Sequence, residues 1–161
     1  MGNIRRSRGY SYEYSLVKRI NLKSHWNARR LGGSSTGLPD IVAVNNKTAT
    51  ILSIEAKSGT GDNLYIPQDQ IERCFAIITM FSYYKNRHVI LAFKFMRKKR
   101  MTKNKETIYE KRKLLEYYKN ADQIYKRKTI PVIKCTYDGK TYSLLDGKTS
   151  SIDLPDYSMP F

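Results

Sequence analysis

The sequence predicts an α/β fold in which a mixed sheet is flanked by helices, with a helix and a β-hairpin added at the C-terminal end. Two observations support this class. Apolar residues recur at helical spacing in residues 10–24 and 67–85, and short runs rich in β-branched residues alternate with them. The order α-β-β-β-α-β then follows, in a chain whose 161 residues are 40% hydrophobic and suit one domain with a packed core.

The first half of the chain is expected to form one helix and three strands. A helix over 10–24 would present one apolar stripe, made of Tyr10, Tyr14, Leu16, Val17 and Ile20. Residues 25–33 are a short strand candidate that ends in a loop of glycine, serine and threonine. Residues 39–45 and 48–57 are consistent with strands joined by a tight turn at Asn45-Asn46-Lys47, so we expect them to pair as a hairpin.

A loop over 58–64 leads to the second predicted helix, over 67–85, where Pro67 suits the first turn. Its core stripe is expected to contain Ile71, Cys74, Phe75, Ile78, Phe81 and Ser82. The run HVILAFKF at 88–95 is typical of a buried strand. Residues 1–96 would therefore form the core.

Residues 97–161 are expected to extend the same domain. The basic stretch 97–105 is interpreted as a loop or helix lead-in. Residues 105–120 predict a helix, with Ile108, Leu115 and Tyr118 as its packed face. Asp138-Gly139 predicts the turn of a hairpin over 130–146, and the proline-containing tail shows no periodicity.

The net charge of +16 is concentrated in two segments. Residues 1–30 contain eight Lys or Arg and one acid, and residues 97–128 contain thirteen basic and four acidic side chains. The remaining segments are almost neutral. Charge runs often serve only solubility, but two local blocks of this size favour a polyanionic partner, of which nucleic acid is the commonest.

The composition also bears on compartment. No apolar run approaches the roughly 18 residues of a membrane span, and the first residues lack the apolar stretch of a signal peptide. Cys74 and Cys135 form neither a disulfide framework nor a zinc pattern. We therefore expect a soluble intracellular protein with reduced thiols and no membrane partner, located in the cytoplasm or nucleoid, or in a host cell if the protein is viral.

The neutral middle of the chain contains the acids most suited to chemistry. Asp40 follows Pro39 at the start of one predicted strand, and Glu55 and Lys57 share a face near the end of the next. Asp40 and Glu55 are symmetric about a turn within 46–49, so a hairpin would place them opposite one another. Two carboxylates at one sheet end suit Mg²⁺, which uses one or two carboxylates with waters and a substrate phosphate. Lys57 could orient or deprotonate water, or stabilise developing negative charge.

The pattern Pro39-Asp40 followed by Glu55-Ala56-Lys57 resembles that of the PD-(D/E)xK nuclease superfamily. More narrowly, the chain is similar to the archaeal Holliday junction resolvases over roughly residues 8–95. The other features that carry this resemblance are Glu13 on the first helix, Arg30 before a small-residue loop with Ser34, and Tyr65 five residues ahead of Gln70. The resemblance implies a restriction-endonuclease-like core.

Carried over by position, the resemblance also implies roles for single residues. Glu13, Asp40 and Glu55 would serve the metal site, with the backbone carbonyl of Ala56, and Lys57 would be the catalytic lysine. The remaining roles fall to Arg30 at the scissile or a neighbouring phosphate, Ser34 in a loop near the cut strand, and Gln70 as a water-positioning residue. Arg29 and Gln68 remain alternatives to Arg30 and Gln70.

The chain departs from the family pattern in three places. Tyr14 follows the helix glutamate where a basic residue is often found, the loop from Ser34 to Asp40 is longer than in short relatives, and the basic segment 97–128 has no evident counterpart. The expected DNA contacts are Arg5, Arg6, Arg8, Arg29, Arg30, Ser34, Arg97, Lys98, Lys99 and Arg100.

These observations together predict a Mg²⁺-dependent endonuclease, with Mn²⁺ as a substitute, that makes paired nicks in DNA four-way junctions. A homodimer would match the two-fold substrate. Three alternatives stay open: another nuclease of the superfamily acting on flaps, nicks or duplex DNA, a non-catalytic DNA-binding protein on a nuclease-like core, and an RNA- or ribosome-associated basic protein.

Overall fold

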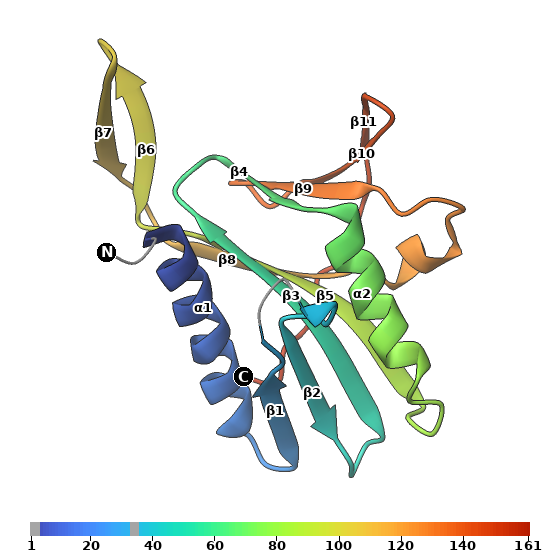
Figure 1. Cartoon of the computed structure of the whole chain (residues 1–161). Coiled ribbons are helices and arrows are strands. Elements are labelled where there is room, and N and C mark those ends of the chain that lie inside the picture. Colours follow the sequence, from blue (N-terminus) through green and yellow to red (C-terminus); the bar gives the residue numbers. More distant parts are fainter. Residues whose placement is uncertain (1–3, 33–35) are drawn as a thin grey trace.

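The computed structural model describes residues 4–32 and 36–161, and of residues 4–7 it describes the backbone alone. A central five-stranded sheet lies between two helices, a second sheet of four strands packs beside it, and a two-stranded hairpin projects from one end (Figure 1). The elements are α1 (Ile4–Asn21), β1 (Trp26–Arg30), β2 (Ile41–Asn45), β3 (Thr50–Gly59), β4 (Asn63–Ile66), α2 (Gln68–Thr79), β5 (Asn86–Phe95), β6 (Lys98–Lys103), β7 (Glu106–Lys111), β8 (Leu115–Asn120), the 3₁₀ helix η2 (Asp122–Lys126), β9 (Val132–Thr136), β10 (Thr141–Leu145) and β11 (Lys148–Ser151).

The central sheet has the strand order β1-β2-β3-β5-β8. Only the β3–β5 pair is parallel, and it extends over ten residues from Thr50 opposite Asn86 to Gly59 opposite Phe95. The other three pairs are antiparallel. The mixed sheet expected from the sequence is therefore present, and α2 is the crossover that joins its two parallel strands.

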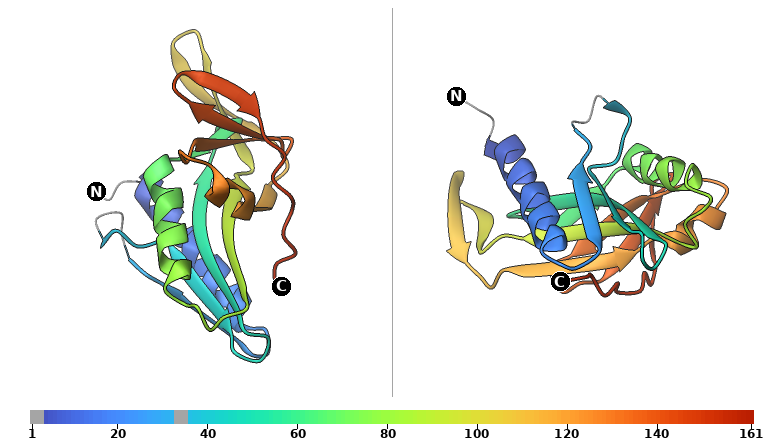
Figure 2. Two further views of the ribbon diagram at one scale, coloured as in Figure 1. Left: turned by 90° about the vertical axis from the view of Figure 1, so that its right-hand side faces the viewer. Right: turned by 90° about the horizontal axis from the view of Figure 1, so that it is seen from below.

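Side chains of β3 alternate between two apolar layers, as the period of a strand requires. On one face Leu52 and Ile54 pack against α1, whose buried residues include Tyr12, Leu16 and Ile20. On the other face Ile51 packs with Ile71, Cys74, Phe75 and Ile78 of α2. Helices thus cover both faces of the sheet, and Figure 2 shows them from two further directions.

The second sheet has the order β11-β10-β9-β4 and is antiparallel throughout. The hairpin predicted at Asp138-Gly139 is confirmed as β9 and β10. The loop predicted over 58–64 is wrong in part, because β4 begins at Asn63 and pairs with β9. Leu64 and Ile133 place this sheet against the α2-side core.

The basic stretch 97–105, expected as a loop or helix lead-in, contains strand β6 instead. The helix predicted over 105–120 is also wrong, since this segment forms β7 and β8. Its Lys, Glu and Leu residues favour a helix locally, but β8 completes the central sheet by pairing with β5. The Asn104-Lys105 turn between β6 and β7 has positive φ at both residues, which is the conformation that a two-residue hairpin turn needs.

Several element boundaries also differ from expectation. α1 begins at Ile4 rather than residue 10, and it buries Tyr12 while Tyr14 is 61% exposed. α2 ends at Thr79, which leaves Phe81 beyond the helix and 38% exposed. β11 follows the predicted hairpin, and the irregular tail bridges back to β8 through Asp156. Of the helices in the described ranges, none is long and apolar enough to cross a membrane.

Candidate active site at the end of the β2–β3 hairpin

The two candidate acids of the central hairpin lie next to one another. Ile41 pairs with Ile54, so the register continues to Asp40 opposite Glu55, as expected from the sequence. The Oδ2 atom of Asp40 accepts a hydrogen bond from the backbone N–H of Ala56 at 2.9 Å. The backbone of β3 therefore holds Asp40 beside Glu55, one residue before β2 begins.

Glu55 is the most deeply buried carboxylate of this pair, with 4% of its surface exposed. Burial, the charge of Asp40 and a hydrogen bond with the Asp40 side chain raise the pKa of Glu55 to about 9, while Lys57 acts in the opposite direction. Glu55 therefore keeps its proton at neutral pH in the absence of a cation. A bound cation would replace this proton.

The donor set fits a hard divalent cation, for which one or two carboxylates with waters and a substrate phosphate suffice. Within residues 4–32 and 36–161, no three His, Cys, Asp or Glu side chains are grouped so as to hold a metal ion. Asp40 and Glu55, adjacent on one hairpin, are thus the acids that the structure brings together. Glu13 also lies near this pair, but its carboxylate forms an ion pair with Arg30.

Glu13 lies on α1, is 7% exposed, and forms an ion pair with Arg30 of β1. The Nε atom of Arg30 donates a hydrogen bond to Oε2 of Glu13 at 2.5 Å. Burial raises the pKa of Glu13, Asp40 raises it further, and Arg30 and Lys57 counteract both. Glu13 on α1 therefore interacts electrostatically with Asp40 and Lys57 at the end of the β2–β3 hairpin.

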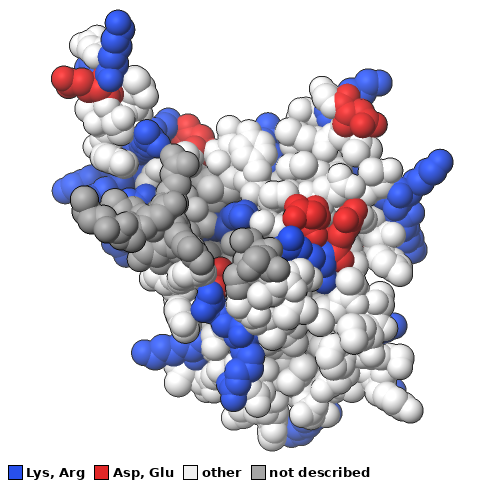
Figure 3. Space-filling model, in the orientation of Figure 1, with Lys and Arg blue, Asp and Glu red and all other residues white. Residues whose placement is uncertain are grey.

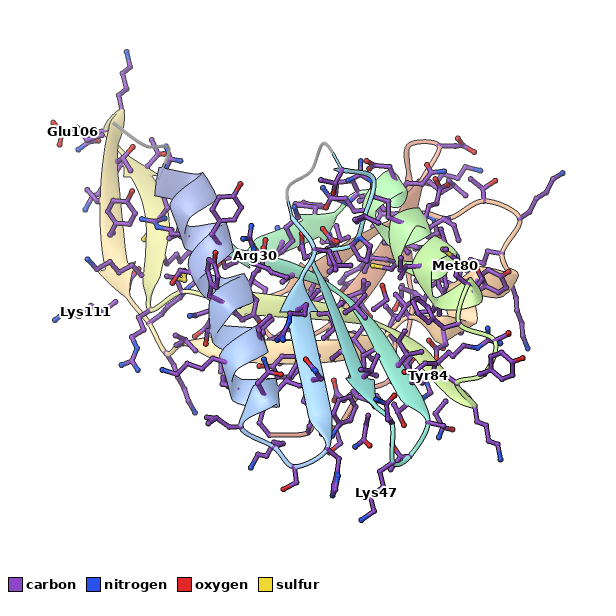
Figure 4. The ribbon with its side chains drawn as sticks, turned by 60° about the horizontal axis from the view of Figure 1, so that its bottom comes forward. Arg30, Lys47, Met80, Tyr84, Glu106 and Lys111 are labelled. Carbon is purple, nitrogen blue, oxygen red and sulfur yellow. The ribbon has the colours of Figure 1, made fainter. Side chains whose placement is uncertain are left out.

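Two tyrosines of α1 surround the Arg30 guanidinium. Its Cζ atom lies 4.4 Å from the ring centroid of Tyr10 and 4.9 Å from that of Tyr14, and Nη1 donates a hydrogen bond to the Tyr14 hydroxyl at 3.3 Å. Figure 4 shows Arg30 beside α1. Sequence reasoning assigned these tyrosines to the core, although their i, i+4 spacing already placed both on the helix face that carries Glu13.

The members of the two pairs of alternatives have different surroundings. Arg30 contacts Glu13, whereas Arg29 is exposed and donates to the carbonyl of Ala28. Gln70 is half-buried, and its Oε1 atom is buried without a hydrogen-bond partner within the described chain, whereas Gln68 donates to Glu72 on the surface of α2.

The other predicted positions are spread more widely. Ser34 lies outside the described residues, as do the side chains of Arg5 and Arg6 on α1. Arg97 precedes β6, and Lys98, Lys99 and Arg100 lie on it. These residues therefore belong to the projecting β6–β7 hairpin and not to the candidate site at the end of the β2–β3 hairpin. Basic side chains are spread over the face drawn in Figure 3, while acidic ones gather at a few places.

The chain is similar to proteins of known family and structure. The family model described as archaeal Holliday junction resolvase (Hjc) matches residues 4–132. The chain is 33% identical over 104 residues, 56% of its length and 83% of the relative, to a crossover junction endodeoxyribonuclease of Sulfolobus islandicus rod-shaped virus 1. It is also similar in fold to Hjc, a Holliday junction resolvase of the hyperthermophile Archaeoglobus fulgidus, with a TM-score of 0.53, 20% identity, and coverage of 81% and 85% of the two chains.

Proposed function

The chain belongs to the archaeal Holliday junction resolvase family, and from this premise we propose that Asp40, Glu55 and Lys57 form the centre at which it hydrolyses DNA. The protein is a junction-resolving endodeoxyribonuclease. The observation that carries the proposal is the pair of adjacent carboxylates, one of them buried, at the hairpin register. A buried acid whose pKa is strongly raised is typical of functional sites.

We propose Mg²⁺ as the cofactor, with Mn²⁺ as a substitute, held by Asp40, Glu55 and the backbone carbonyl of Ala56. When bound, such a cation supplies Lewis acidity toward a phosphate oxygen and makes water more acidic. Glu55 has to release its proton to accept the cation, because the protonated carboxyl is a poor ligand. Affinity for the cation should therefore rise with pH.

The protein's own residues divide the remaining tasks. Lys57 shares the face of Glu55 and would stabilise negative charge on the attacked phosphate or take a proton from water. Arg30, held by Glu13 and the two tyrosines, would bind a neighbouring phosphate with a fixed guanidinium. Gln70 would orient water through its unpartnered Oε1 atom.

The test compares the wild type with Asp40→Asn on junction, flap and linear duplex DNA, with Mg²⁺ or with EDTA. Asparagine still accepts the Ala56 hydrogen bond, so the fold should persist. We expect paired symmetric nicks in the junction by the wild type with Mg²⁺, no nicks by Asp40→Asn, and equal junction binding by both. Asp153→Asn, an exposed acid in the tail, is the matched control and should nick normally.

Each other outcome contradicts a part of the proposal. Equal cutting of linear duplex would indicate a different nuclease of the same superfamily. Junction binding by the wild type without nicks, with Mg²⁺ and also when Mn²⁺ replaces it, would indicate a non-catalytic DNA-binding protein. Nicking by Asp40→Asn would remove Asp40 from the centre.

We further propose that the active form is a homodimer, since two strands of a two-fold junction need two active sites. Sedimentation should give twice the chain mass for the protein alone, and twice the chain mass plus the mass of the junction for the complex with DNA. Mixed dimers of wild type and Asp40→Asn should nick one strand without resolving the junction. A monomer that makes both nicks would overturn this assembly.

A further inference from the structure

The two basic segments of the sequence meet at one cavity. It has a volume of about 470 Å³ and is lined by Arg8, Thr60, Met96, Arg97, Lys98, Tyr109 and Leu114. Its walls thus come from α1, the ends of β3 and β5, and both strands of the projecting hairpin. Three of these lining residues are cationic and none is acidic, and Met96, Leu114 and the ring of Tyr109 supply apolar surface.

The base of this hairpin is anchored to the core by Arg112. The side chain of Arg112 donates to the carbonyls of Met96, Gly59 and Gly61 and pairs with Asp62 at 3.2 Å. Asp62 also binds Lys99 at 2.8 Å, and the backbone N–H of Arg100 donates to the carbonyl of Thr60. The cavity is therefore preformed at the fixed base, while the tip extends away (Figure 1).

The two faces of the hairpin differ in charge. Cross-strand pairs alternate between faces in an antiparallel ribbon. One face carries the pairs Lys99–Glu110, Met101–Ile108 and Lys103–Glu106, in which each cation lies opposite an acid. The other face carries Lys98–Lys111, Arg100–Tyr109 and Thr102–Thr107 and has no acid. Figure 4 labels Glu106 near the tip and Lys111 near the base.

Two lysines directly opposite one another repel and destabilise a ribbon. Lys98 and Lys111 are in this position. They lie on the acid-free face of the hairpin, from which Lys98 and Tyr109 line the cavity. A polyanion on this face would relieve the repulsion. Tyr109 is 53% exposed, so its ring is accessible to an aromatic ligand, and bases stack readily on such rings.

We propose that this cavity holds one unstacked nucleotide of the DNA substrate, with its base on Tyr109 and its phosphates at Arg8 and Lys98 of the cavity wall. Arg100, which lies opposite Tyr109 on the same face of the hairpin, would bind a phosphate beside the cavity. This inference rests on the proposed function and adds a recognition site to it. Thr60 directly follows β3 and lies three residues beyond Lys57, ~10 Å away. Arg8 lies five residues before Glu13, roughly 7.5 Å along α1. One strand can therefore reach both sites, and a nucleotide unstacked at a junction's branch point would be bound beside the cut.

The test measures binding in EDTA, so that no cleavage intervenes, to a four-way junction, a duplex with one unpaired nucleotide, and a fully paired duplex. Tyr109→Ala should weaken binding to the first two by roughly 5- to 100-fold and to the paired duplex by less than about twofold. Tyr109→Phe should bind like the wild type. Ile108→Ala is the matched control, an exposed neighbour on the opposite face, and should change nothing.

A second test on the same hairpin removes a charge and does not involve the Tyr109 ring. Arg100→Ala should reduce the slope of log affinity against log salt by about one, as expected for one lost phosphate contact. Lys103→Ala, on the neutral face, should leave the slope unchanged. Equal effects of the two variants would overturn the assignment of the DNA to the cavity face.

Three other outcomes would overturn the base-binding proposal. These are unchanged junction binding by Tyr109→Ala, an equal loss on all three DNAs, and a similar loss by Ile108→Ala. These binding measurements in EDTA do not depend on the proposed catalytic centre. That centre is tested by the nicking of junction DNA with Mg²⁺. Ile108→Ala, on the opposite face of the hairpin, should nick as fast as the wild type.

Discussion

Glu55 is the residue whose ionisation most affects the metal-free protein. Its pKa is raised to about 9 in the folded state from 4.5, so the folded state holds a proton that the unfolded chain releases. Its contribution to stability is present below pH 4.5 and is lost as the pH rises toward 9. We expect the free energy of unfolding in EDTA to fall across this window by at most about 1.4 kcal/mol per pH unit.

Urea denaturation between pH 5 and 9 would measure this slope. Glu55→Gln keeps the shape of the side chain and removes the titration, so the slope over this window should flatten. Equal slopes for both proteins would mean that Glu55 is ionised throughout. Saturating Mg²⁺ should also flatten the wild-type slope if Asp40 and Glu55 hold the cation, because a bound cation excludes the proton.

Arg30 allows a second prediction at this scale. Its guanidinium lies over Tyr14, an exposed ring, so the contact should contribute about 0.5–1 kcal/mol. Tyr14→Ala should therefore raise the KM for junction DNA about two- to fivefold with little change in kcat. Tyr14→Phe, which keeps the ring and loses the hydroxyl, should have a smaller effect, and Leu22→Ala, exposed beyond α1, should have none. A fall in kcat alone would contradict a role in binding.

The part of the candidate site that lies on two adjacent strands could be predicted from the sequence. The position of Asp40 beside Glu55 follows from counting residues across one hairpin, and the structure has that register. The partner of Arg30 was not predictable in this way, because Glu13 reaches it from another element. The unpartnered oxygen of Gln70 likewise depends on how α2 packs on the sheet.

At the scale of elements, the turn between β9 and β10 depends on Gly139. Its φ is +85°, and a Cβ atom there would lie 2.6 Å from the Tyr117 ring of β8. Tyr117 is fixed by a hydrogen bond from its hydroxyl to the carbonyl of Tyr137, so it cannot move freely. We expect Gly139→Ala to destabilise the protein by about 2–3 kcal/mol.

Gly147 provides the control for this substitution. Its φ of +74° is similar, but a Cβ atom there meets no atom within 4 Å. Gly147→Ala should therefore cost only the backbone strain, about 1 kcal/mol. Urea denaturation of both variants separates strain from the clash, and equal losses would show that the Tyr117 contact does not matter.

The same scale explains which elements could be predicted. Asp138-Gly139 specifies its turn locally, and the stripe of α2 is buried by any sheet placed against it. Residues 105–120 carry no such local signal, because Tyr117 and Tyr118 suit a strand while the Lys and Glu residues suit a helix. Strand pairing decides the outcome, because β7 pairs with β6 and β8 pairs with β5. The second of these pairings depends on the whole central sheet.

At the scale of the whole molecule, the C-terminal tail completes the core on the α1 side. Met159 is 8% exposed and packs in the same cluster as Leu16 and Ile90, and Phe161 lies under the guanidinium of Arg19 at 3.8 Å. We expect Met159→Ala to lower the free energy of unfolding by about 2–3 kcal/mol. Ser158→Ala, exposed beside it, should change it by less than about 0.5 kcal/mol, and similar values for the two would mean that the tail is not docked.

The tail also affects whether the central sheet can associate edge to edge with the sheets of other copies of the chain. A sheet with open edges is a template on which further strands can add, which leads to aggregation. At β8 this edge is occupied, because the tail exchanges backbone hydrogen bonds with Tyr118 and Asn120 through Tyr157 and Pro155. At β1 the other edge ends in Arg29 and Arg30. Charge at one edge and the chain's own terminus at the other therefore both oppose edge-to-edge polymerisation.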